Sequence, residues 1–77
     1  MHYYEKIKEL RVQNNLSQAQ ISEVLEIKQP QYHRYESGAR EMPIHLMIKL
    51  ADFYGVSLDY IAGRTEEPKA DEFKNIG

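Results

Sequence analysis

The stretch LSQAQISEVLEIKQPQYHRYESG, residues 16–38, has the pattern of a short helix, a turn and a second helix. Ser17 is followed three residues later by Gln20, a spacing that forms a capping box and satisfies two free N–H groups at a helix start. The apolar residues that follow at helical spacing are Ile21, Val24 and Leu25. This pattern predicts a short helix directly after Ser17.

The second helix of the stretch is expected to start between Lys28 and Pro30. Proline fits the first turn of a helix, because its missing N–H is not needed there. Gly38 can adopt the positive φ of a C-terminal cap and is expected to end the helix. Lysine is a poor N-cap and proline favours an extended conformation for the residue before it, so Gln29 is an alternative N-cap.

This second helix has two different faces when its residues are spaced at 100°. One face carries Tyr32, Tyr35 and Glu36, and the other carries Pro30, His33, Arg34 and Ser37. We expect the tyrosine face to pack on neighbouring helices and the opposite face to point outward. A helix of this kind after a short helix and a turn has the form of a helix-turn-helix reader. An ordinary solvated face is the alternative.

The rest of the chain has helical apolar spacing as well. A first helix is expected within residues 3–14, with Ile7, Leu10 and Val12 as its apolar positions. Pro43 opens a further helix, PIHLMIKLADFY, which ends at Gly55 and offers Met47, Ile48, Leu50, Ala51 and Tyr54 for burial. Ser57 is the expected N-cap of a last helix, SLDYIAG. The predicted fold is therefore all-α with five short helices.

Composition limits the class of protein. The 77 residues suit one domain, and the absence of cysteine excludes a disulfide framework and a cysteine-ligated metal site. No apolar run approaches the roughly 18–20 residues of a membrane helix, so we expect a cytoplasmic protein without a membrane partner. We expect a domain over residues 1–65 and a charged, flexible tail over 66–77.

The charge is unevenly distributed along the chain. The net charge is −2, but residues 66–77 hold Glu66, Glu67, Asp71 and Glu72 against Lys69 and Lys74, so residues 1–65 sum to zero. Residues 28–40 contain Lys28, Arg34 and Arg40 against Glu36, a local sum of +2. Local clustering matters more for DNA than the total, so the composition leaves a nucleic-acid partner open.

Three motifs in register resemble one family: LSQ at residues 16–18, RYESG at 34–38 and KLADFYGVSLDYIAG at 49–63. Over roughly residues 4–65 the chain resembles the Cro/repressor-type, or Xre-like, helix-turn-helix regulators. The resemblance implies a compact five-helix lambda-repressor-like domain whose second and third helices form the helix-turn-helix. It also implies a sequence-specific double-stranded DNA-binding transcriptional regulator, a repressor of a palindromic operator, which needs no cofactor and acts at the nucleoid.

The resemblance assigns DNA-contacting roles to matching positions. The base-contacting residues would be Gln29, Pro30, His33 and Arg34, and the phosphate-contacting residues would be Gln18, Lys28, Gln31 and Arg40. Arg34 can bind guanine O6 and N7 with two hydrogen bonds, whereas Pro30 offers only apolar contact. A phosphate contact is the alternative for Arg34, and a solvated loop charge is the alternative for Arg40. The turn residue is Glu26 where the family often has glycine, so we expect a positive φ there or a reshaped turn.

The resemblance also assigns structural and assembly roles. Arg11 and Glu36 match a partly buried salt bridge that holds the reading helix. A homodimer interface would use Tyr54, Leu58, Tyr60 and Ile61, although these residues could simply close the core of one chain. Val24 is a second, weaker indication of a contact surface.

The sequence bears on two other function classes. An antitoxin-like or other protein-interaction module could use the tail EEPKADEFKNIG, with Phe73 and Ile76 as anchors for a regulatory protein partner. An enzyme is disfavoured, because His2, His33 and His45 lie on separate elements without metal-ligand spacing and no phosphate-binding glycine loop is present.

Overall fold

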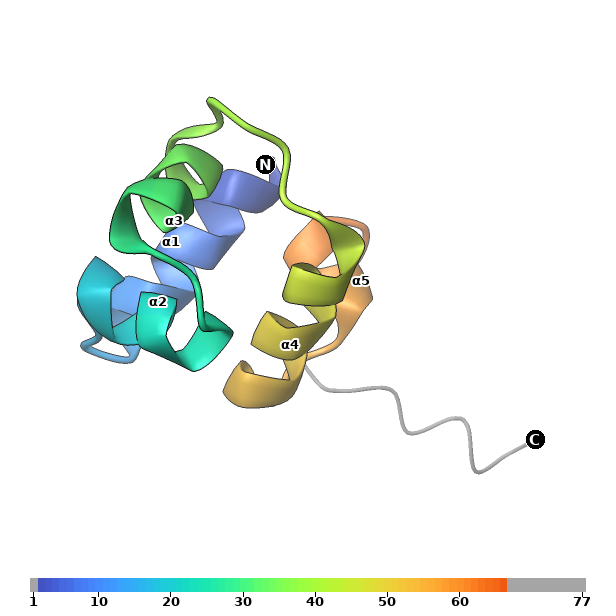
Figure 1. Cartoon of the computed structure of the whole chain (residues 1–77). Coiled ribbons are helices and arrows are strands. Elements are labelled where there is room, and N and C mark those ends of the chain that lie inside the picture. Colours follow the sequence, from blue (N-terminus) through green and yellow to red (C-terminus); the bar gives the residue numbers. More distant parts are fainter. Residues whose placement is uncertain (1, 67–77) are drawn as a thin grey trace.

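The computed structural model describes residues 2–66, and these residues form helices and turns without a strand. The helices are α1 (Tyr3–Gln13), α2 (Gln18–Leu25), α3 (Gln29–Ser37), α4 (Ile44–Tyr54) and α5 (Leu58–Ala62). Helices α1, α2 and α3 lie together on one side, and α4 and α5 lie on the other (Figure 1). The all-α prediction is confirmed. The predicted tail lies outside the described residues, except for Glu66.

The core lies between these two groups of helices. Its buried apolar residues are Ile7, Leu10, Ile21, Leu25, Tyr32, Tyr35, Met42, Leu46, Met47, Leu50, Ala51 and Ile61. Every helix contributes at least one of them, as the apolar spacing predicts. Two predicted apolar positions are wrong, since Val12 is 55% exposed and Ile48 is 46% exposed. Both lie on the outward side of their helices.

The capping box predicted at the start of α2 is confirmed. The Ser17 hydroxyl accepts a hydrogen bond from the Gln20 N–H at 3.0 Å, and the Gln20 side chain accepts from the Ser17 N–H at 2.8 Å. The helix ends at Glu26, whose φ is 61°. This left-handed conformation costs a residue other than glycine roughly 1–2 kcal/mol, so the turn is closed despite local strain.

The start of α3 settles which residue is its N-cap. Lys28 is extended, with φ −82° and ψ 149°, and makes no side-chain cap hydrogen bond. Its carbonyl accepts the first helical hydrogen bonds, from Gln31 and Tyr32. Gln29 is already helical, so the alternative that Gln29 is the cap is wrong. Pro30 lies in the first turn, where no partner for an N–H is required.

Gly38 ends α3 with φ 83° and lies against the ring of Tyr4. A Cβ atom at this position would be 3.0 Å from the tip of that ring, whereas a Cβ at Gly55, with φ 70°, would meet nothing within 4 Å. A substitution at Gly55 therefore measures the backbone cost of a positive φ without a steric clash.

We expect Gly38→Ala to lower the free energy of unfolding more than Gly55→Ala. Both variants lose roughly 1–2 kcal/mol because alanine disfavours positive φ. Gly38→Ala should lose about 1–3 kcal/mol more, because the new methyl group displaces the Tyr4 ring. Urea unfolding followed by circular dichroism measures both values, and equal losses would contradict a tight Gly38–Tyr4 contact.

Candidate nucleic-acid interface

The outward face of α3 is where the sequence predicts it. Pro30, His33, Arg34 and Ser37 are all exposed. On the opposite side, Tyr32 is fully buried and Tyr35 is 3% exposed. The two tyrosines therefore fix the helix on the core while the polar face remains free. Burial of the Tyr32 ring also raises the pKa of its hydroxyl, so this group stays neutral.

An open concavity joins the outward face of α3 to the start of α2. Its volume is about 400 Å³. It is lined by Gln18, Gln29, Pro30, His33 and Arg34. Four of the five residues that line it were predicted as base-contacting, and the fifth was predicted as phosphate-contacting. The four predicted base contacts share one face of α3, and the packing of α2 on α3 adds Gln18 to the same surface.

The two glutamines of the predicted phosphate set are partly engaged within the chain. Gln18 donates from its side-chain nitrogen to a Glu36 carboxylate oxygen at 2.9 Å. Gln31 donates in the same way to the Tyr35 hydroxyl at 2.9 Å. Each amide nitrogen keeps a second N–H. The Gln18 bond joins α2 to α3 and depends on how these helices pack, so the sequence pattern does not indicate it. The Gln31 bond joins residues four apart within α3.

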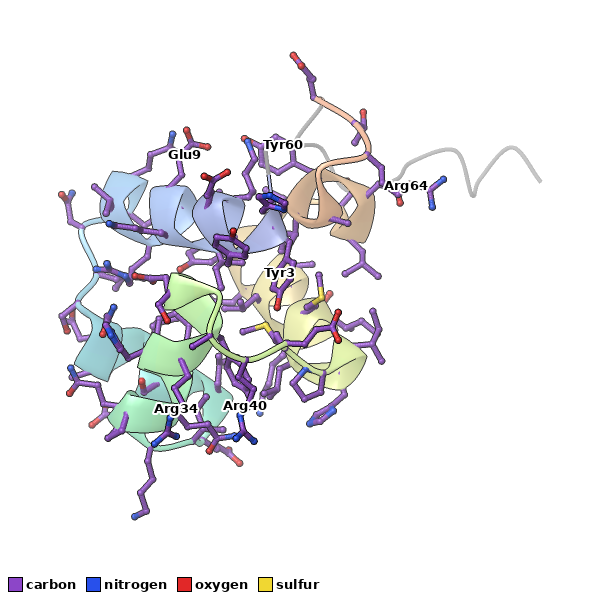
Figure 2. The ribbon with its side chains drawn as sticks, turned by 90° about the horizontal axis from the view of Figure 1, so that it is seen from above. Tyr3, Glu9, Arg34, Arg40, Tyr60 and Arg64 are labelled. Atoms are coloured by element: carbon purple, nitrogen blue, oxygen red, sulfur yellow. The ribbon has the colours of Figure 1, made fainter. Side chains whose placement is uncertain are left out.

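Two arginines lie at the edge of the same surface. Figure 2 shows Arg34 and Arg40 beside each other, and the Arg40 N–H donates to the Arg34 carbonyl oxygen at 3.1 Å. Both side chains are exposed, and neither forms an ion pair with another residue of the described range 2–66. Arginine that is free of carboxylates is available to an external anion, and its five donors suit phosphate or a base edge.

The chain contains an Arg11–Glu36 ion pair, as the resemblance implies, and it is well shielded from solvent. Arg11 Nε lies 2.8 Å from one Glu36 oxygen, and Arg11 Nη2 lies 2.9 Å from the other. Side-chain exposures are 13% for Arg11 and 3% for Glu36. A further N–H of Arg11 donates to the Leu16 carbonyl at 2.8 Å. This pair therefore ties the end of α1 to α3 and to the start of α2.

Glu36 has an altered pKa as a result. Burial raises the pKa of a carboxyl, but the hydrogen bonds from Arg11 and Gln18 outweigh it, so the pKa of Glu36 lies below its ordinary value. Glu36 accepts three such bonds in all. Since Gln18 also lines the concavity, the buried pair is linked to the outward surface by one side chain.

The predicted dimer residues differ in how much surface they offer. Ile61 is fully buried in the core of the single chain, so its assignment to a dimer interface is wrong. Tyr54, Leu58 and Tyr60 are half-buried against that core. Burial also raises the pKa of Tyr54 to about 12. Val24 likewise packs partly on the core rather than lying free.

Two exposed apolar side chains on α4 lie outside the predicted set of dimer residues. Ile44 is 58% exposed and Phe53 is 46% exposed. The signal was available in the sequence, because the apolar residues of α4 extend around more of the helix than one stripe can bury. They lie nine positions apart in the sequence, which places them on opposite sides of α4. Only Phe53, whose ring meets that of Tyr54 edge to face, adds to the apolar surface near Tyr54.

Residues 2–66 contain neither a metal-ligand cluster nor a membrane-spanning helix. No group of three or more metal-ligating side chains is gathered there. In the same range, no helix has the length and apolar character that crossing a membrane requires.

The comparisons with known proteins agree with this geometry. The helix-turn-helix family model matches residues 7–61. The chain is 33% identical over 75 residues to the uncharacterized HTH-type transcriptional regulator YobD of Bacillus subtilis, covering 96% of this chain and 67% of that protein. It is 31% identical to the HTH-type transcriptional regulator ImmR of Bacillus subtilis, and the match covers 87% of this chain and 53% of ImmR. It is 29% identical to the cryptic phage CTXphi transcriptional repressor RstR of Vibrio cholerae, and the match covers 91% of this chain and 63% of RstR.

The chain therefore belongs to the Cro/repressor-type helix-turn-helix family, and its five helices form the lambda-repressor-like fold of that family. The members of this family are DNA-binding transcriptional regulators rather than enzymes. The chain spans between about half and two thirds of the length of these curated relatives. No solved structure matches it.

Proposed function

We propose that the chain is a sequence-specific double-stranded DNA-binding transcriptional repressor that places α3 in the major groove. The observation that carries this proposal is the concavity beside α3, which gathers Gln29, Pro30, His33 and Arg34 with Gln18. Donors, acceptors and an apolar group side by side are what base edges in the major groove require. A solvated face would need no such convergence from two helices.

The residues of this surface have distinct roles. Arg34 binds guanine through its two parallel donors, and Gln29 pairs with adenine or bridges to a phosphate. His33 donates to an acceptor on a neighbouring base. Arg40 and Lys28 contact phosphates on either side, and the free N–H groups at the start of α2 attract a third. Gln18 and Gln31 add a contact through the amide N–H that the chain leaves free.

The proposal includes a homodimer formed through the α4–α5 side. Tyr54, Leu58 and Tyr60 remain partly accessible there, and Phe53 beside Tyr54 adds exposed apolar surface. A two-fold dimer sets its reading helices about one DNA turn apart, ~34 Å, which requires a palindromic operator. Such a dimer acts at the nucleoid in the cytoplasm, and a regulatory protein partner could control its concentration.

Selection of bound sequences from a random duplex pool tests the proposed function. The expected result is an enriched palindrome whose affinity falls steeply with salt, because each phosphate contact releases counterions. Sedimentation of the chain with the selected duplex then gives the number of copies bound. An enriched sequence without two-fold symmetry would remove the dimer from the proposal. Failure to enrich any sequence would overturn sequence-specific binding itself.

A further inference from the structure

The loop of residues 38–43, between α3 and α4, carries Arg40 and is held at several points. Gly38 donates from its N–H to the Tyr35 carbonyl, and Arg40 donates to the Arg34 carbonyl. Two residues further on, the Met42 side chain is 4% exposed. The backbone of Arg40 is therefore fixed between the end of α3 and a buried anchor, while its side chain points to solvent.

The anchor at Met42 includes Tyr3, a residue that is distant from it in the sequence. The Met42 N–H donates to the Tyr3 hydroxyl at 2.8 Å, a bond between residues 39 positions apart. Tyr3 is in the first turn of α1, and Figure 2 shows it apart from the arginine edge, with the loop between them. Tyr3 thus reaches the loop by a single hydrogen bond and does not line the concavity beside α3.

The neighbouring aromatic ring supports the other end of the loop. The ring of Tyr4 lies against Gly38, as its 3.0 Å separation from a Cβ built there indicates. The rings of Tyr3 and Tyr4 meet edge to face with centroids 5.8 Å apart, and His2 stacks on Tyr4 at 5.0 Å. The start of α1 therefore braces the loop on both sides of Arg40.

We propose that Tyr3 is a positioning residue for DNA binding, which holds the loop so that Arg40 meets the DNA backbone beside Arg34. This inference rests on the proposed DNA-binding function. When an arginine side chain binds, the loss of rotamer freedom costs roughly 1.5–2 kcal/mol of conformational entropy, and ordering a flexible backbone adds to that cost. A fixed loop reduces the ordering that must occur on binding, which strengthens the contact without touching DNA.

A double-mutant cycle with Tyr3→Phe and Arg40→Ala tests this inference. Tyr3→Phe keeps the ring but removes the acceptor for the Met42 N–H. We expect Tyr3→Phe to weaken binding of the selected duplex about threefold, because one hydrogen bond fixes the loop. Arg40→Ala should weaken binding about fivefold and reduce the salt dependence by about one phosphate contact. The double variant should bind no more weakly than Arg40→Ala alone, because Tyr3 acts through Arg40.

Tyr4→Phe is the matched control, because the Tyr4 hydroxyl makes no hydrogen bond within residues 2–66 and the ring on Gly38 is kept. It should leave the affinity unchanged, and Tyr3→Phe should leave the order of preferred bases unchanged. Losses that multiply in the double variant would overturn the inference, as would wild-type affinity in Tyr3→Phe. If the wild-type chain binds no duplex, the proposed function fails instead. Loss of binding in Arg34→Ala alone, with Arg40→Ala unaffected, would remove the inference and leave the function.

Discussion

Arg11→Met is expected to lower the free energy of unfolding by about 3–5 kcal/mol, because it leaves the Glu36 carboxylate buried without its cation. Glu36 is 3% exposed at its side chain and would keep one hydrogen bond, from Gln18. Single domains are stable by about 5–15 kcal/mol, so this loss is a large part of the total. Urea unfolding of both proteins at pH 7 measures it.

The Lys6–Glu9 pair provides a matched control. The Lys6 Nζ lies 3.1 Å from a Glu9 carboxylate oxygen, one turn further along α1. The side-chain exposures are 15% for Lys6 and 39% for Glu9. Pairs of this kind contribute about 0–1 kcal/mol, because water and salt screen them. Lys6→Met should therefore lose less than about 1 kcal/mol, although it also removes the cation 4.3 Å from the Tyr60 ring. Similar losses in Lys6→Met and Arg11→Met would refute the special cost of the buried pair.

The pH dependence gives a second check, with opposite signs in the two proteins. In the wild-type chain the pKa of Glu36 is lowered, so the stability from this group is present above its unfolded pKa and is lost as pH falls through the folded value. In Arg11→Met, burial without the guanidinium should raise the pKa of Glu36 above its unfolded value. The variant should then regain stability as pH falls from about 7 to 5.

Local chemistry explains which features could be predicted from the sequence. The capping box at Ser17, the first-turn place of Pro30 and the left-handed Gly38 each depend on a few adjacent residues, and the structure contains all three. The outward face of α3 follows from helical spacing alone. These features define the reading surface, so most of the candidate site was accessible from local patterns together with the resemblance.

The features that were missed depend on contacts between distant segments. The length of α5 does not reveal that Ile61 is needed to complete the core of one chain. Gln18 is polar at a helix start, and only the packing of α2 on α3 places its amide on Glu36. The hydrogen bond from the Met42 N–H to the Tyr3 hydroxyl joins residues 39 positions apart, and no periodic pattern in the sequence predicts it. Tertiary packing therefore decides which polar side chains remain free for a partner.

The replacement of Arg34 is expected to have the largest effect on DNA recognition. Arg34→Ala removes the donors that can bind guanine O6 and N7, so preference at one position of each half-site should relax by about 1–3 kcal/mol, or roughly 5–150-fold.

Two further variants separate base reading from charge. Arg34→Lys keeps the charge but not the planar pair of donors, so it should retain the salt dependence while losing the base preference. Arg64→Ala controls for loss of one arginine, because Arg64 is exposed beyond α5, far from Arg34 in Figure 2. Its affinity and base preference should match the wild type. Competition binding against duplexes changed one base at a time measures all three variants. If Arg34→Ala instead weakens every duplex equally, with the salt slope reduced by about one contact, Arg34 binds phosphate and the base is read by its neighbours.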